Sequence, residues 1–208
     1  GTKDNPELGY RSRYSHQREE AHPGYYKVTL DDYNINAELT ATERVGFHKY
    51  TLPKSDSAHI ILDLTSGIYN YDGKVVWSSI RVENDTLVTG YRQTNGWART
   101  RLLYFAMTFS KPIQSYGLVN KEELIYKGFW RKFDQNKNFP EQAGYKIVGY
   151  FDFKTEDGEA ILIKFALSAV STKNALENLI AEIPHWDFEK IKSQAKQKWN
   201  DELSKITI

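Results

Sequence analysis

Residues 25–52 have the sequence YYKVTLDDYNINAELTATERVGFHKYTL, in which aromatic and β-branched residues alternate approximately with polar ones. The alternation falls into three short runs, at 25–30, 33–39 and 47–52, each bounded by Asp, Gly or Pro. Because successive side chains of a strand point to opposite faces of a sheet, such runs are typical of half-buried strands. The stretch therefore predicts a meander of antiparallel strands.

The same signal continues along the chain. Runs at 58–64 and 74–82 are more uniformly apolar, which is typical of strands covered on both faces, and Asp72-Gly73 between them is a hairpin signal. Further runs follow at 86–92, 102–110, 146–154 and 160–168, whereas residues 121–142 show no regular period. About eight to ten strands at this spacing predict a mainly β fold, an antiparallel β-sandwich over residues 25–170.

The two ends of the chain differ from this pattern. Residues 1–24 are polar and lack either period, so we expect an irregular N-terminal arm. Residues 171–208 change to a helical period, with Ser171 as an N-cap, Pro184 ending the first helix and Asp187 beginning the second. These linker helices follow the sandwich. The apolar stripe of the second helix, from Phe188 to Ile206, predicts poor anchoring without a further domain.

Composition excludes several classes of function. The 28 basic and 27 acidic residues nearly cancel, so the positive field typical of nucleic-acid binding is missing. The sequence contains no run of about 18 apolar residues that would predict a membrane span. The lack of cysteine excludes disulfides and thiolate metal sites. The five histidines form no i, i+4 pair, and none of the standard catalytic motifs is present. No catalytic or metal-ligating residue is therefore predicted.

One polar segment concentrates hydroxyl, imidazole, carboxylate and phenol groups: residues 14–26, YSHQREEAHPGYY. From the residues alone, this segment could hydrogen-bond a sugar, or it could be a capped loop whose Pro23-Gly24 turn begins the first strand. The adjacent acidic pairs, such as Glu19-Glu20, are expected to be solvated, since neighbours on a strand point to opposite faces and cannot form the opposed pair of a glycosidase.

Residues 14–53, YSHQREEAHPGYYKVTLDDYNINAELTATERVGFHKYTLP, resemble the Ser-His-x-x-Glu-x-Ala-x-Pro-Gly-Tyr-Tyr and Glu-Leu-Thr-Ala-Thr-x-Arg-Val-Gly-x-His blocks of glycoside hydrolase family 92, a family of α-mannosidases. The similarity continues through 58–64, 96–98, 104–106, 109–112, 167–171, 178–183 and 186–188, and so covers most of the chain.

This resemblance implies a two-domain, exo-acting enzyme, in which a β-sandwich and a helical connector precede an (α/α)6 barrel. The barrel is expected to hold the catalytic acid, the base and a calcium ion, and to hydrolyse terminal α-mannosides with inversion. Mannose-containing glycans and the enzyme's own C-terminal catalytic domain are the implied partners, and the bacterial periplasm or cell exterior is the implied location. This chain alone is expected to be inactive and to bind no metal.

The resemblance also marks six residues as candidates for substrate binding or for the domain interface: Ser15, His16, Glu19, Arg44, His48 and Trp97. Arg44 and His48 are four positions apart on strand-like sequence and so share a face, where they could satisfy a buried carboxylate or line the inter-domain cleft. His16 and Glu19 are expected to order the cleft rather than to react with substrate.

A second interpretation remains open at this point: a stand-alone carbohydrate-binding β-sandwich without hydrolase activity. The aromatic share of 14% and the missing catalytic motifs favour it. A reading frame that continues for roughly 500 residues of helical period beyond Ile208 would favour the enzyme instead.

Overall fold

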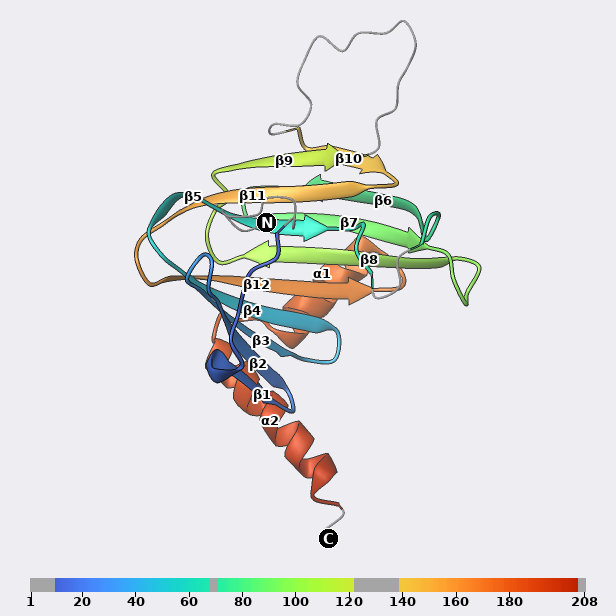
Figure 1. Cartoon of the computed structure of the whole chain (residues 1–208). Coiled ribbons are helices and arrows are strands. Elements are labelled where there is room, and N and C mark those ends of the chain that lie inside the picture. Colours follow the sequence, from blue (N-terminus) through green and yellow to red (C-terminus); the bar gives the residue numbers. More distant parts are fainter. Residues whose placement is uncertain (1–9, 68–70, 122–138, 206–208) are drawn as a thin grey trace, which may run out of the picture.

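The computed structural model describes residues 10–67, 71–121 and 139–205. They form two antiparallel sheets of unequal size, packed face to face and followed by two C-terminal helices (Figure 1). The predicted antiparallel β-sandwich with C-terminal helices is confirmed. Neither helix in these ranges is long and apolar enough to span a membrane.

Each sheet pairs its strands in antiparallel fashion throughout. The larger sheet has the order β1 (Glu19–His22), β2 (Tyr25–Leu30), β3 (Ile35–Ala41), β4 (Val45–Leu52), β12 (Glu159–Ser168), β8 (Arg101–Phe109), β7 (Leu87–Thr94), β6 (Val75–Val82) and β10 (Glu141–Gly144). The smaller sheet has the order β5 (Ser55–Asp63), β11 (Ile147–Thr155) and β9 (Ser115–Asn120).

Three of these strands were not predicted from the sequence: β1, β9 and β10. β1 lies within the arm that was expected to be irregular, and its four residues are mostly exposed. β10 is equally short, and β9 has only six residues, one of which is a glycine. Each pairs with a longer neighbour, so the partner strand supplies the order that the local sequence does not signal. The sequence shows no regular period over residues 121–142, and 122–138 of this segment lie outside the described residues.

The larger sheet is covered on both faces. Between the sheets lies a core that includes Phe109, Phe151, Ile80 and Ile161, all almost completely buried. A second core under the helices contains Phe47 and residues from both helices. Each fully buried large apolar side chain contributes roughly 1.5–3 kcal/mol, so the two cores together hold the helices and the small sheet against one central sheet.

The helices α1 (Thr172–Glu182) and α2 (Phe188–Leu203) begin where the sequence predicted. The Ser171 hydroxyl accepts a hydrogen bond from the Asn174 backbone N–H at 3.1 Å, and the Asp187 carboxylate accepts one from the Lys190 N–H at 3.0 Å. These side chains satisfy N–H groups that the first turn of a helix leaves unpaired. α1 packs on β12 and β8, whereas α2 packs on β2, β3 and β4.

The expected poor anchoring of α2 is wrong for its first half, because the chain's own sheet covers it. Phe188, Ile191 and Ala195 are buried. α2 also passes over the β1–β2 turn at Gly24, where a Cβ atom would lie only 2.9 Å from the Cβ of Ala195. Beyond this point Leu203 is 56% exposed, and Figure 1 shows α2 running past the end of the sheet. Ile206 lies outside the described residues.

This division predicts different costs for two similar truncations on one helix. Ile191→Ala should lower the free energy of unfolding by roughly 2–5 kcal/mol, because it leaves a cavity in the second core. Leu203→Ala should change it by about 0.5 kcal/mol or less, because that side chain is largely solvated. Urea denaturation of the two variants measures both values. Equal losses would show that α2 is not anchored mainly through its first half.

Candidate functional site

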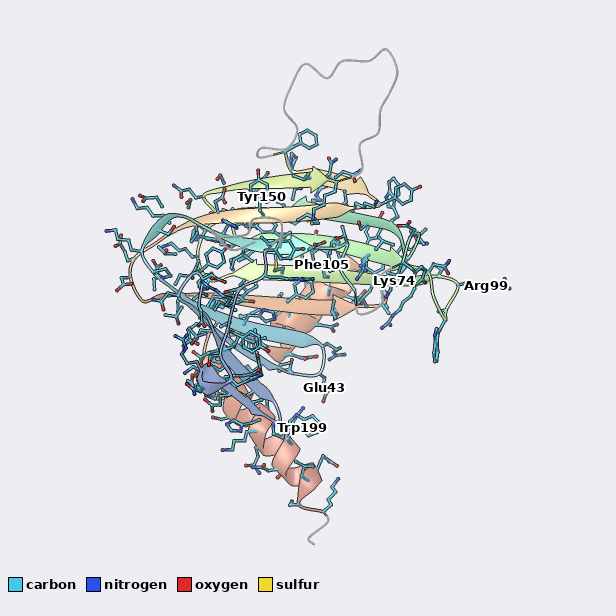
Figure 2. The ribbon with its side chains drawn as sticks, in the orientation of Figure 1. Glu43, Lys74, Arg99, Phe105, Tyr150 and Trp199 are labelled. Atoms are coloured by element: carbon cyan, nitrogen blue, oxygen red, sulfur yellow. The ribbon has the colours of Figure 1, made fainter. Side chains whose placement is uncertain are left out.

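One end of the larger sheet collects connections that are far apart in the sequence. Val45 pairs with Ala166 and Ser168 pairs with Tyr104, so β4 and β8 both begin where β12 ends. The turn at 42–44 and the loop at 95–100 therefore project from the same end, which we call the Trp97 end. Figure 2 shows Glu43, Lys74 and Arg99 on this side of the molecule.

Trp97 lies in the loop that joins β7 to β8, and its side chain is fully exposed. The base of this loop is held by backbone and side-chain hydrogen bonds: the Asn95 N–H donates to the Lys74 carbonyl at 2.8 Å, and the Tyr71 hydroxyl donates to the Asn95 carbonyl at 2.7 Å. The loop thus presents an indole ring on a fixed base. Because the ring is exposed, it contributes little to the stability of the fold, and its flat apolar face suits stacking against a sugar.

Arg44 lies in the neighbouring turn and is bound to α1. Its Nε donates to Glu182 Oε1 at 2.5 Å, and its backbone N–H donates to Glu182 Oε2 at 3.1 Å. The Thr42 hydroxyl donates to the same Oε2 at 2.5 Å. Burial by itself would raise the pKa of Glu182, but the hydrogen bonds from Thr42 and Arg44 together hold that pKa below its usual value. Arg44 therefore pairs with a partly buried carboxylate, one of the two roles expected for it.

His48 lies on β4, on the face toward the smaller sheet. Its Nδ1 is 3.0 Å from the Tyr50 hydroxyl, and burial lowers the pKa of the imidazole, so the ring is neutral at pH 7. Arg44 and His48 both line a cavity of about 520 Å³ between β4 and the free edge of β5. The rest of its lining is largely apolar and includes Ile60 and Phe165.

Ser15, His16 and Glu19 form a separate cluster around a single turn of 3-10 helix, His16–Arg18. His16 Nδ1 lies 2.5 Å from Glu19 Oε2, and the Tyr26 hydroxyl donates to Glu19 Oε1 at 2.6 Å. The hydrogen bond from Tyr26 is the main cause that lowers the pKa of Glu19, and the bond with His16 is the second. The Tyr26–Glu19 hydrogen bond also raises the pKa of Tyr26 to about 12. The cluster lies at the start of β1, away from the β1–β2 turn and the Trp97 end (Figure 1).

The six candidate residues are therefore not gathered at one place. Three form the cluster at β1, two line one cavity, and Trp97 is alone on its loop. Sequence reasoning missed Glu182 as the partner of Arg44, because 138 residues separate them and only the fold brings them together. It also missed the basic and aromatic residues around Lys74, for which no spacing signal exists.

Two models of one protein family match the sequence over most of its length. The model of the Glycosyl hydrolase family 92 N-terminal domain matches residues 1–168, and the model of the Glycosyl hydrolase family 92 catalytic domain matches residues 174–208. The chain belongs to glycosyl hydrolase family 92. Within family 92, the sandwich corresponds to the N-terminal domain, whereas the match to the catalytic-domain model covers α2 and all but the first two residues of α1.

Two mannosidases of family 92 with solved structures show the same fold. The α-mannosidase BT3965 from Bacteroides thetaiotaomicron is 35% identical, with a TM-score of 0.85 over 100% of this chain and 27% of that chain. The inverting mannosidase BT2199 from Bacteroides thetaiotaomicron VPI-5482 is 28% identical, with a TM-score of 0.74 over 91% of this chain and 23% of that chain. An uncharacterized secreted glycosidase of Arthroderma benhamiae is 25% identical over 90% of this chain and 25% of its own length. The chain thus spans about a quarter of each relative.

The Glu182 contacts predict how the stability of this family 92 chain depends on pH. Because the folded-state pKa of Glu182 is lowered, its contribution is fully present above the unfolded pKa of about 4.3 and is lost as pH falls through the folded-state value. Glu182→Gln should lower the free energy of unfolding by roughly 1–3 kcal/mol at pH 7. The difference in the free energy of unfolding between this variant and the wild type should shrink between about pH 5 and pH 3.

The matched control is Glu177→Gln on the exposed face of α1, where an ion pair with Lys173 at 3.8 Å contributes little. Denaturant unfolding at several pH values measures both variants. A Glu182→Gln effect that stays constant down to pH 3 would contradict the assignment.

Proposed function

We propose that this chain is the N-terminal part of an exo-acting α-mannosidase that hydrolyses terminal α-mannosides of glycans. The observation that carries the proposal is the match of the whole chain to the mannosidase BT3965, at 35% identity and a TM-score of 0.85. A second structure of BT3965, 36% identical to this chain, is a complex with mannoimidazole. An inverting mechanism is proposed for the parent enzyme, since BT2199 is an inverting mannosidase.

The proposed contribution of this chain is substrate recognition at the Trp97 end, with the catalytic acid and base in the remainder of the enzyme. The carboxylates near the 42–44 turn support this division. Glu43 is ion-paired with Lys198 at 3.0 Å, and Glu182 is held by Arg44. A general acid needs a raised pKa, whereas that of Glu182 is lowered.

Calcium dependence is also proposed for the parent enzyme, with the ion bound outside this chain. Across residues 10–67, 71–121 and 139–205, no three His, Asp or Glu side chains converge in a way that could hold a metal ion. We therefore propose that the described residues of this chain take no part in holding the ion.

The proposed partner of this chain is the enzyme's own catalytic domain. The second half of α2 supports this, because it extends beyond the sheet and exposes Trp199 and Leu203. A cavity of about 480 Å³ between α2 and the 42–44 turn, lined by Glu43, Arg44 and Lys198 among others, continues the same surface. The cluster of Ser15, His16 and Glu19 is proposed as a second domain contact, since the His16 side chain is 85% exposed and so available to a partner surface. A location in the periplasm or outside the cell is proposed, because one relative is a secreted glycosidase.

The proposal is tested by comparing the 208-residue chain with the full-length enzyme on an α-linked mannobiose, with and without calcium. The full-length enzyme should release mannose in a calcium-dependent reaction, and the chain alone should show no turnover above background, because it lacks both catalytic carboxylates. Calcium-dependent turnover by the chain alone would contradict the division of labour, and an inactive full-length enzyme would contradict the mannosidase assignment.

The role of Trp97 is tested in the full-length enzyme. Trp97→Ala should lower kcat/KM by roughly tenfold or more, about 1.4 kcal/mol or more of lost transition-state binding, while the Tm stays within about 1 °C because the exposed indole contributes little to the fold. Trp97→Tyr should retain part of the activity through its remaining ring. The control is Tyr33→Ala at the β2–β3 turn, which lies at the opposite end of the sheet. Equal kinetics for Trp97→Ala and wild type would exclude a substrate contact.

A further inference from the structure

A cavity of about 620 Å³ opens at the Trp97 end, apart from the two cavities described above. It lies where residues 71–75 meet the end of β9 and the turn between β10 and β11. Three of its lining residues are lysines from three separate segments, Lys74, Lys121 and Lys146, and one, Asp72, is acidic. Since the whole chain carries a net charge of only +1, this is a local concentration of positive charge.

Within the described residues, Lys121 is paired with the carboxylate of Asp63, whose oxygens are occupied by other donors. Asp63 Oδ1 accepts hydrogen bonds from the Thr65 N–H at 2.7 Å and the Thr65 hydroxyl at 2.6 Å. Asp63 Oδ2 accepts from the hydroxyls of Tyr10 and Ser66. The Lys121 ammonium lies 3.9 Å from Oδ2, at the outer limit of an ion pair, and its side chain is half exposed. Asp63 thus only weakly compensates the charge of Lys121.

Two further cations add to the positive field. Asp63 also interacts with the charge of Arg92, so one carboxylate faces two cations. Within the described ranges, the Nε and one Nη atom of Arg92 are buried without a hydrogen-bond partner. Lys146 is exposed and forms no ion pair with any residue in the described part of the chain. Lysine ammonium groups arranged in this way bind a phosphate or carboxylate as point charges.

Two tyrosine rings complete the cavity. Tyr71 and Tyr145 are each about half exposed, at 53% and 45%. Each is held on one side, Tyr71 through its hydrogen bond to the Asn95 carbonyl and Tyr145 through an edge-on contact with Trp77 at 5.0 Å between ring centroids. Exposed, positioned rings beside polar groups suit the apolar face of a sugar, whereas a site for a bare inorganic anion would not need them.

We propose that this cavity binds a sugar that carries a negative charge, a phosphate or a carboxylate, with Tyr71 and Tyr145 against the sugar and Lys121 and Lys146 around the anion. Its place in the enzyme rests on the proposed function, because the hydrogen bonds of Asn95 join the cavity wall to the Trp97 loop. The cavity is thus a subsite for charged, mannose-capped glycans.

The test is a titration of the 208-residue chain, followed by NMR, with mannose 6-phosphate, glucuronic acid, methyl α-mannoside and inorganic phosphate as probes. At least one of the two anionic sugars should bind at least tenfold more tightly than both methyl α-mannoside and inorganic phosphate. This binding should weaken as salt is added, because the lysines are solvent-exposed. Lys146→Gln should weaken it severalfold, and Lys121→Gln with Lys146→Gln by tenfold or more.

The matched control is Lys173→Gln with Lys190→Gln on the two helices, which removes the same charge far from the cavity and should leave binding unchanged. Equal binding of methyl α-mannoside would overturn the role of the anion, and equal binding of inorganic phosphate would overturn the role of the sugar. Equal effects of the cavity and control variants would overturn the location. Because binding is measured without turnover, these outcomes stay separate from the mannobiose assay that tests the proposed function.

Discussion

The burial of β12 on both of its faces is the constraint on which the other parts of the structure depend. Ile161 and Ile163 pack toward the smaller sheet, whereas Lys164 and Ala166 face the helices. Lys164 is only 4% exposed, and its ammonium donates to the Ile183 carbonyl at 2.9 Å and lies 4.0 Å from the centre of the Trp186 ring. A buried ammonium is costly without such partners, so this one residue requires the connection between α1 and α2 to stay on the sheet.

The position of the Trp97 end follows from this arrangement. Since β12 is central and antiparallel to both β4 and β8, the turn before β4 and the loop before β8 must leave the sheet on the same side. Helix α1, which covers β12, also brings Glu182 to that side, where Arg44 and Thr42 bind it. Packing far from the surface thereby determines which charges are neutralised at this end and which, such as that of Lys146, remain available to a ligand.

The chemistry available at the Trp97 end is that of recognition. Its exposed groups include an indole, two phenols and ammonium groups, whereas the carboxylates of Glu43 and Glu182 are engaged in ion pairs. Proton transfer to a glycosidic oxygen needs an acid of raised pKa, and hydrogen bonding lowers that of Glu182. This balance supports the proposal that, in the family 92 enzyme, the sandwich shapes one wall of the cleft and the remaining polypeptide performs the hydrolysis.

The sequence alone determined most strands, both helix caps and the family resemblance. Strand alternation and the N-caps Ser171 and Asp187 depend only on nearby residues, so they do not require knowledge of how the strands pair. The tertiary structure decided what depends on distant pairing. β1, β9 and β10 are ordered by their partner strands, Glu182 meets Arg44 across 138 residues, and α2 finds part of its apolar surface within the same chain. Likewise, Tyr71, Lys121 and Tyr145 surround one cavity only because strand register brings their segments together, and register is a property of the whole sheet.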